Sequence, residues 1–287
     1  MSRNYQLFDD LPEQTAPVSV FQAGVDPVWT EHKAQLIARY LRYFVFITKH
    51  GAYIDGFAAP KDPDNPESWA AKLVVNSTPK FLKQFFLCEI DRRRASHLYE
   101  LKKSQPSKPN RTIEVLEGDF NNVIDEILGS GLITDKTASF CLLDQYSCEC
   151  HWRTLEKLAA HKSIGEHKIE LFYFLATGWL GRSLSGFSVN TEEPKLWWGK
   201  PDWRSLIGRG GDSIALEMSE RFRDELGYRY VSPWPIYEKE KGTGRVMFHM
   251  IHASDHYEAP KLMRRAFKNV LSAPEPEEQL EMELSDL

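Results

Sequence analysis

Short apolar runs alternate with longer stretches of helical spacing through the first part of the chain. The runs have the length and composition of buried strands and fall at residues 52–57, 85–90, 112–116, 139–143 and 169–175. Helical spacing precedes and separates them at residues 30–49, 70–83, 92–103, 121–128 and 152–161. Because strand–helix–strand crossovers are right-handed, this rhythm predicts an α/β, Rossmann-like fold with a mostly parallel sheet and helices on both faces.

The pattern changes after the fifth strand. Residues 177–211 are rich in Gly and Trp and are predicted to form an insertion or lid. A helix over residues 213–226 is followed by two strand patterns, at 230–237 and 245–252, whose Gly-containing connection predicts a C-terminal β-hairpin. The last helix is predicted over residues 259–271.

The two ends of the chain lack such patterns. Residues 1–27 contain scattered prolines without a hydrophobic period, which predicts an N-terminal arm. Residues 273–287 combine proline with glutamate, and we expect an acidic disordered tail there. One α/β domain is therefore expected over residues 28–272, with the insertion near residues 177–211.

Charge is distributed unevenly along the sequence. The 36 Lys and Arg residues against 41 Asp and Glu residues give a net charge of -5. Six of the acids and no basic residue lie in the last fifteen positions, so residues 1–272 carry a net charge of +1. The composition therefore does not exclude a polyanionic partner such as nucleic acid.

Composition and cysteine content narrow the class of protein. Hydrophobic residues make up 42% and charged residues 27%, which is typical of a globular protein and not of a disordered or fibrous one. No apolar run reaches the roughly 18 residues of a membrane helix, and the polar start after Met1 lacks a signal segment. We therefore expect a cytoplasmic protein without a membrane partner. The cysteines are too few for a disulfide framework and are expected to be reduced thiols: Cys88, Cys141, Cys148 and Cys150.

An acidic residue stands at or just after the end of each of the first four predicted strands. Ligands of a parallel sheet bind beyond the carboxyl ends of its strands, so these side chains are the first candidates for a site. They are Asp55, Glu89 or Asp91, Asp119 and Asp144.

Carboxylates in this arrangement suit a nucleoside cofactor that carries no phosphate. One carboxylate accepts both ribose hydroxyls, another accepts the adenine amino group, and a sulfonium cation is attracted to nearby acids. These requirements point to S-adenosylmethionine. The alternative is that the acids cap the helices that follow, as Asp91 before Arg92 and Asp119 before Phe120 are placed to do.

An ordered set of short motifs resembles the three-Cys-motif partner (TcmP) family. The motifs are WTEHK at 29–33, YIDGFA at 53–58, CEID at 88–91, GDFN at 118–121, LLDQY at 142–146 and MIHASDH at 250–256. The resemblance spans about residues 28–270. It implies a class I methyltransferase fold with a seven-stranded sheet, S-adenosylmethionine as the cofactor, and a radical-SAM-like protein with a three-cysteine motif as a partner.

The resemblance also implies roles for individual residues. Cofactor binding falls on Asp55, Gly56, Phe57, Glu89, Asp91 and Asp119. Asp144 and Tyr146 match an Asp-Pro-Pro-Tyr-like motif of amino-methyltransferases, in which the acid holds the target amine and the ring stacks on the base. Asp144 and Tyr146 are therefore the predicted catalytic residues.

The sequence departs from the family pattern at two places. Ala59 and Lys61, followed by Asp62, replace the last two glycines of a Gly-Phe-Ala-Gly-Pro-Gly pattern, and Gln145 and Ser147 replace the Pro and Gly that follow the acid of the fourth strand. A side chain in place of glycine crowds the path of a cofactor, because only glycine lets the backbone approach a ligand so closely.

Three further features have a functional and a structural interpretation. Trp179, Trp197, Trp198 and Trp203 are candidates for stacking on an unpaired or flipped base, or they pack the insertion onto the sheet. Arg264, Arg265 and Lys268 are candidates for phosphate contacts, or they form a solvated helix face. The Cys148-Glu149-Cys150-His151 segment lacks the second ligand pair of a structural zinc site, so no metal is expected.

Two functions are compatible with these patterns. The first is S-adenosylmethionine-dependent methyl transfer to an amino group of a nucleic acid base. The second is a catalytically degenerate, methyltransferase-like binding or scaffold protein that works with another enzyme in a modification or defence system, which the changes at Ala59, Lys61, Gln145 and Ser147 favour. A nuclease that binds Mg²⁺ fits less well, because its carboxylates would have to converge on one point.

Overall fold

A computed structural model of the chain describes residues 28–187, 191–239 and 243–271. The predicted N-terminal arm, the acidic tail and most of the predicted hairpin loop lie outside these residues. None of the helices within the described ranges is long and apolar enough to cross a membrane.

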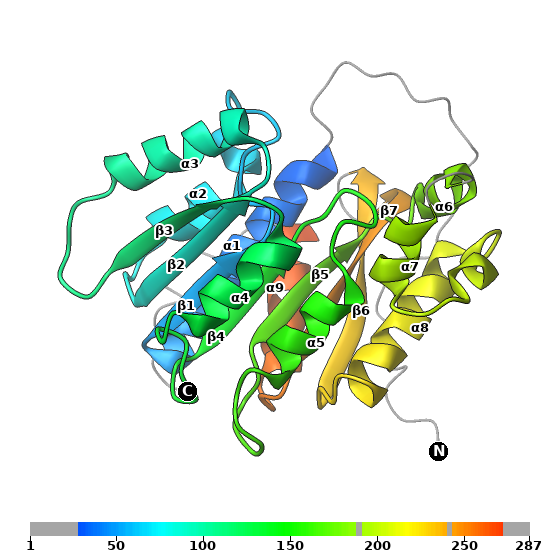
Figure 1. Cartoon of the computed structure of the whole chain (residues 1–287). Coiled ribbons are helices and arrows are strands. Elements are labelled where there is room, and N and C mark those ends of the chain that lie inside the picture. Colours follow the sequence, from blue (N-terminus) through cyan, green and yellow to red (C-terminus); the bar gives the residue numbers. More distant parts are fainter. Residues whose placement is uncertain (1–27, 188–190, 240–242, 272–287) are drawn as a thin grey trace.

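One seven-stranded sheet forms the centre of the described chain (Figure 1). Its strands are β1 (Gly51–Asp55), β2 (Leu82–Glu89), β3 (Thr112–Glu117), β4 (Ser139–Leu143), β5 (Glu170–Leu175), β6 (Tyr230–Lys239) and β7 (Thr243–Ser254). They lie in the order β3-β2-β1-β4-β5-β7-β6. The first five strands are parallel, whereas β7 runs antiparallel to both β5 and β6. The predicted α/β fold with a mostly parallel sheet and a C-terminal hairpin is confirmed.

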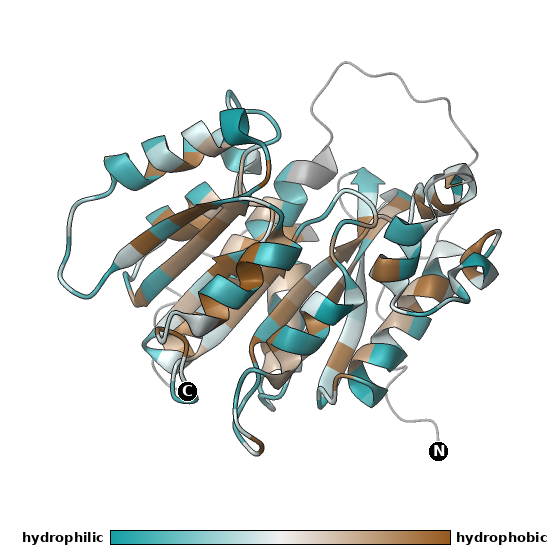
Figure 2. Cartoon of the chain, viewed as in Figure 1, coloured by the Kyte–Doolittle hydropathy of each residue, from teal (hydrophilic) through white to brown (hydrophobic). Residues whose placement is uncertain are grey.

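Helices cover both faces of this sheet because the strands are apolar on both sides. Tyr53 and Phe85 contribute to the core under one face, while their neighbours Ile54 and Phe86 contribute to the core under the other. The first face carries α1 (Val28–Thr48), α2 (Ala70–Asn76), α3 (Arg92–Ser104) and α9 (Ala259–Leu271). The second carries α4 (Phe120–Gly129), α5 (Trp152–Ala160), α6 (Leu180–Gly186), α7 (Glu192–Trp198) and α8 (Gly211–Asp224). Figure 2 shows the apolar residues gathered along the strands and the hydrophilic ones on the outer sides of the helices.

The predicted helix over residues 70–83 is too long. The observed helix, α2, ends at Asn76, and Leu82 already belongs to β2. Pro79 lies between them and cannot continue a helix, because it lacks a backbone N–H and restricts the residue before it. The predicted strand 139–143 and helix 259–271 match β4 and α9 at both ends.

The described residues between 177 and 210 form α6, α7 and a short 3₁₀ helix, Trp203–Leu206, beside α5 and α8. Trp197, Trp198 and Trp203 are buried in the second core, so they pack this segment and present no stacking surface. The guanidinium carbon of Arg221 lies 4.3 Å from the ring centroid of Trp198 and 3.6 Å from that of Trp152. The structural interpretation therefore holds for three of the four tryptophans.

Candidate functional site

A cavity of about 210 Å³ opens at the carboxyl ends of the central strands. The strand order reverses between β1 and β4, and open α/β sheets bind their ligands at such a switch point. The loop after β1, the ends of β2, β3 and β4, and the first half of α1 line the cavity.

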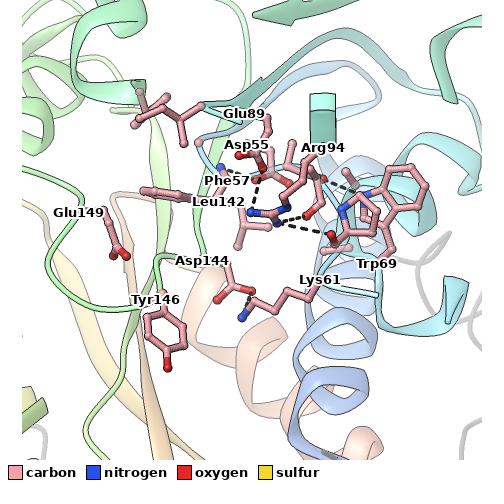
Figure 3. Close-up of a pocket in the computed structure, with 18 of the residues that line it drawn as sticks. Asp55, Phe57, Lys61, Trp69, Glu89, Arg94, Leu142, Asp144, Tyr146 and Glu149 are labelled. Carbon is pink, nitrogen blue, oxygen red and sulfur yellow. Dashed lines mark hydrogen bonds and ion pairs between the residues drawn. The ribbon is translucent and has the colours of Figure 1, made fainter. Parts of the chain in front are cut away.

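Three predicted acids, from adjacent strands, meet in this cavity. Asp55, Glu89 and Asp119 all line it. Figure 3 shows Asp55 and Glu89 side by side at the ends of β1 and β2. Asp55 is buried and accepts hydrogen bonds from the Tyr53 hydroxyl at 2.8 Å and from the Phe57 backbone N–H at 3.1 Å. Burial nevertheless raises the pKa of Asp55 to about 7. This carboxyl group is therefore ready to change its charge when a cation binds nearby.

Glu89 is also buried but keeps contact with the cavity. Its Oε1 accepts the backbone N–H of Asp91 at 2.9 Å, and its Oε2 lies 3.5 Å from the guanidinium of Arg94. Arg94 also donates to the backbone carbonyls of Ala59 and Pro60 at 3.2 and 3.4 Å, so it links the end of β2 to the loop after β1 (Figure 3).

The predicted helix-capping role applies to two acids. Asp91 accepts the backbone N–H groups of Arg93 and Arg94 at the start of α3 and is not among the residues that line the cavity. Asp119 accepts the backbone N–H of Asn121 at the start of α4, yet it also lines the cavity. Capping thus accounts for Asp91, whereas Asp119 combines capping with a place in the site.

Gly56 and Phe57 line the cavity immediately after β1. A Cβ atom on Gly56 would lie 3.0 Å from the Phe120 ring, so a side chain there would force the ring and the start of α4 to move. Glycine at this position therefore lets the loop after β1 pack against α4.

Asp144 lies at the other side of the cavity, where two lysines contact it. Its Oδ1 accepts a hydrogen bond from the buried ammonium of Lys33, and its Oδ2 lies 4.0 Å from the half-exposed ammonium of Lys61. Burial alone would raise the pKa of Asp144, but the charges of Lys33 and Lys61 hold it below its ordinary value. Burial lowers the pKa of Lys33 to about 7, although Asp144 opposes this shift.

Tyr146 provides an exposed ring next to Asp144. Its side chain is 64% exposed and lines the cavity, and its ring centroid lies 5.6 Å from that of Trp179. Gln145, between the two, is fully buried and accepts the backbone N–H of Cys150 at 2.9 Å. Gln145 therefore orders the loop after β4, while its neighbours Asp144 and Tyr146 line the cavity.

The site also contains residues that the sequence analysis missed, among them Lys33, Ile90 and Arg94. Lys33 lies one helical turn before Ile37 on the buried face of α1. A charged residue at a position of the apolar stripe is a sequence signal from which Lys33 could have been predicted as a site residue. Ile90 was predicted to end a buried strand, but it is 71% exposed and lines the cavity. No local pattern indicated that Arg94 turns back toward Glu89.

The predicted nucleic-acid residues lie elsewhere. Arg264, Arg265 and Lys268 belong to α9, and none of them lines the cavity. Arg264 and Lys268 are exposed, whereas the guanidinium of Arg265 lies 5.4 Å from the Tyr43 ring centroid on α1. The structure does not bring this group together with Asp144 and Tyr146.

Cys148 and Cys150 are buried, and burial raises the pKa of the Cys148 thiol to about 12. Among the residues that the structure describes, no group of three or more His, Cys, Asp or Glu side chains is arranged to hold a metal ion.

The strand order, with one antiparallel strand inserted before the last, and the cavity at the switch point define a class I methyltransferase-like α/β fold. No family model and no curated protein matches the chain. Among solved structures it is similar to M. jannaschii TYW2 in complex with AdoMet, at 12% identity over 81% of this chain and 78% of that one, with a TM-score of 0.41. It is also similar to a Legionella pneumophila protein of the DUF519 family, at 11% identity over 86% of this chain and 94% of that one, with a TM-score of 0.46. Both similarities are distant.

Proposed function

We propose that this protein transfers a methyl group from S-adenosylmethionine to an amino group of a nucleic acid base. The observation that carries the proposal is the meeting of Asp55, Glu89 and Asp119 in one cavity at the switch point of the sheet. The motif resemblance to the TcmP family supports the same assignment.

The chemistry of the cavity fits the adenosine half of this cofactor. Glu89 keeps a carboxylate oxygen with an unused lone pair for the ribose hydroxyls, since Arg94 is the one described residue that contacts Oε2. The exposed side chain of Ile90 offers an apolar face for a purine ring. Asp119 can accept from an exocyclic amino group, because a carboxylate has more lone pairs than its cap bonds use.

The buried carboxyl group of Asp55 fits the positive charge of the cofactor. When bound, S-adenosylmethionine supplies a methyl group on an electron-poor sulfonium. A cation close to Asp55 favours its ionised form and offsets the cost of its burial. Asp55 would therefore bind the methionine half of the cofactor in its charged state.

Asp144 and Tyr146 would hold the methyl acceptor. Lys33 fixes Oδ1 of Asp144, and Oδ2 is left to accept a hydrogen bond from the target amine once Lys61 moves away. Lys61 is free to move because it is half exposed. The exposed ring of Tyr146 is placed to stack on the base. Orientation of the amine lone pair is then the main catalytic contribution of the protein.

Methyl incorporation tests this function. Purified protein is incubated with labelled S-adenosylmethionine and with tRNA, rRNA or single-stranded DNA, and compared with Asp144→Asn and a control, Asp125→Asn, at an exposed acid of α4. We expect Asp144→Asn to lower incorporation about 100-fold or more while cofactor affinity stays within a few-fold. Unchanged turnover in Asp144→Asn would remove this residue from the active site.

A second function, that of a binding or scaffold protein, is favoured by one observation. Cations of the chain itself already contact the carboxylates of the site, with Lys33 and Lys61 on Asp144 and Arg94 on Glu89. A site neutralised in this way needs no ligand. In that case the chain would act through a partner, for which the resemblance suggests a protein with a three-cysteine motif. The scaffold function predicts no saturable binding of S-adenosylmethionine, and the enzyme function requires it.

A further inference from the structure

A second cavity, of about 150 Å³, lies at the amino ends of the parallel strands, opposite the strand ends that carry the first cavity. The second half of α1, the beginnings of β4 and β5, the end of β7 and the start of α9 line it. It shares no lining residue with the first cavity, so its occupation is independent of the function proposed above.

One wall of this cavity is apolar. Phe44 and Ile47 of α1 and Ala259 and Leu262 of α9 contribute to its lining. An apolar cavity of about 150 Å³ holds one benzene ring. The body of a ligand here is therefore a single ring or a short branched chain.

Glu170 is a carboxylate in the wall that already has its hydrogen bonds. It accepts from the Tyr40 hydroxyl, from Nε2 of His252 at 3.0 Å and from Oγ of Ser254 at 2.6 Å. Three of the roughly four acceptor sites of this carboxylate are therefore in use, so little capacity is left for a cationic ligand.

Asp255, the other wall carboxylate, is satisfied in the same way. Its Oδ2 accepts from both the backbone N–H and the ammonium of Lys168, at 3.2 and 3.3 Å, and its Oδ1 accepts the backbone N–H of Arg229 at 3.0 Å. The two acids of the cavity therefore retain little hydrogen-bonding capacity for a ligand.

Lys162 supplies donors that the protein leaves unused. Its side chain is 8% exposed, its ammonium donates to the backbone carbonyl of Thr137, and it forms no ion pair with a described residue. Burial lowers the pKa of Lys162 to about 8, which shows that the charges of Asp135 and Glu166 do not compensate for its loss of water. A buried ammonium with spare N–H groups is stabilised by an anion that enters the cavity.

His256 adds a donor of fixed position. Its Nδ1 accepts the backbone N–H of Glu258 at 3.2 Å, so in the neutral ring the proton lies on Nε2. The ring centroid of His167 lies 5.3 Å from that of His256, and both rings line the cavity.

We propose that this cavity binds a small monocarboxylate with an apolar body, whose carboxylate accepts hydrogen bonds from Lys162 and His256. A monoanion is favoured over a phosphate-like dianion because Glu170 and Asp255 lie in the same wall and repel each added negative charge. The size of the cavity limits the ligand to about the dimensions of benzoate.

Benzoate is the probe that tests the proposal. Titration of the full chain by calorimetry, with saturation-transfer NMR as a second readout, should show saturable binding at one site. The neutral analogue benzamide has the same shape, and we expect it to bind at least about tenfold more weakly, because charge-assisted hydrogen bonds are lost. This comparison needs no variant and therefore does not depend on the folding of a mutant.

Two variants identify the site. Lys162→Met keeps the stem but removes the ammonium and should weaken benzoate about tenfold or more, whereas the control Lys136→Met, at an exposed lysine, should leave it unchanged. Ala259→Leu narrows the apolar wall and should also weaken benzoate. Melting temperatures verify that each variant is folded. No saturable binding up to about 10 mM benzoate, equal affinity for benzamide, or full affinity in folded Lys162→Met would overturn the proposal.

Discussion

The ion pair between Lys33 and Asp144 is the most unusual pair of residues in the candidate site. The ammonium of Lys33 is 1% exposed and lies 4.5 and 3.9 Å from the ring centroids of Phe174 and Phe248. Taking two charges out of water is costly, and their attraction offsets this cost only while both partners are present. The pair therefore constrains which substitutions the site tolerates.

Removing Lys33 alone should destabilise the protein. We expect Lys33→Met to lower the free energy of unfolding by about 3 kcal/mol near pH 6, because Asp144 is left without its buried partner. The double variant Lys33→Met/Asp144→Leu should recover most of that loss. Urea unfolding measures the stability of both variants. Lys102 forms an exposed ion pair with Glu114, so the control Lys102→Met should lower the free energy of unfolding by less than about 1 kcal/mol. A double variant no more stable than the single one would contradict this account of the pair.

Asp55 should make cofactor binding depend on pH. Because its pKa in the folded protein is about 7 and that of an unfolded Asp is about 4, the folded state holds the extra proton between these values. The contribution of Asp55 to stability is therefore lost as the pH rises through this window. A bound cation favours the ionised form, so the affinity for S-adenosylmethionine should increase from about pH 5.5 to 7.5 and then level off.

Calorimetry across this pH range checks the Asp55 prediction. Asp55→Asn should weaken binding and flatten the profile, since its side chain does not titrate. The pKa of Lys33 is also about 7, so Lys33→Met is measured as a second variant. Its affinity for S-adenosylmethionine should still increase with pH. A slope that survives in Asp55→Asn would assign the pH dependence to another group.

At the scale of elements, Asn121 connects α4 to the loop after β4. Its amide nitrogen donates to Asp119 at 2.8 Å and to the backbone carbonyl of Glu149 at 2.7 Å. Its amide oxygen accepts the backbone N–H of His151 at 2.9 Å and the hydroxyl of Thr154 at 2.7 Å. One side chain thus holds together the start of α4, the loop that carries Tyr146 and the start of α5.

Asn121→Ala should therefore affect both stability and the site. We expect a loss of about 2–3 kcal/mol in the free energy of unfolding, because the buried hydroxyl of Thr154 and three half-buried partners lose their hydrogen bonds together. The exposed neighbour Asn122 is the matched control, and Asn122→Ala should change the value by less than about 0.5 kcal/mol. Chemical denaturation measures the difference; equal effects of the two substitutions would show that Asn121 is not the connecting residue.

The elements of this fold were predictable where one physical signal dominates. The strand at 139–143 is apolar throughout because both of its faces are buried, and its bounds match β4. The helix from residue 70 was overextended, because the apolar residues 81 and 82 continue its hydrophobic pattern past Pro79 although they begin the next strand. Pro79 is a local signal for the end of the helix, and the prediction failed because the hydrophobic pattern was given more weight than the proline.

Site residues were predictable where the order of strands and helices alone brings them together. Asp55, Glu89 and Asp119 follow buried strands, and parallel strands bring their carboxyl ends to one edge of the sheet. The partnership of Lys33 with Asp144 joins residues that are 111 positions apart, so no spacing reveals it. The capping role of Asp91 was left open because a cap and a ligand contact have the same sequence signature.

At the scale of the whole molecule, the sheet carries a cavity at each end and α1 extends between them. Ala34 and Ile37 of α1 line the first cavity, while Tyr40, Phe44 and Ile47 line the second. The two cavities also differ in chemistry. The first cavity contains carboxylates with unused lone pairs, whereas the second contains cationic donors with unused N–H groups. The two cavities are therefore suited to ligands of different charge.

Binding of S-adenosylmethionine to the first cavity is the central claim, and calorimetry on the purified full chain tests it most directly. We predict saturable binding with one cofactor per chain. Glu89→Gln should weaken this binding about tenfold or more, because it replaces the charged carboxylate that accepts hydrogen bonds from the ribose hydroxyls. The control Glu114→Gln, at an exposed acid of β3, should bind like the unmodified protein. Absence of saturable heat, or an affinity that Glu89→Gln leaves unchanged, would contradict the assignment of this cavity as a cofactor site.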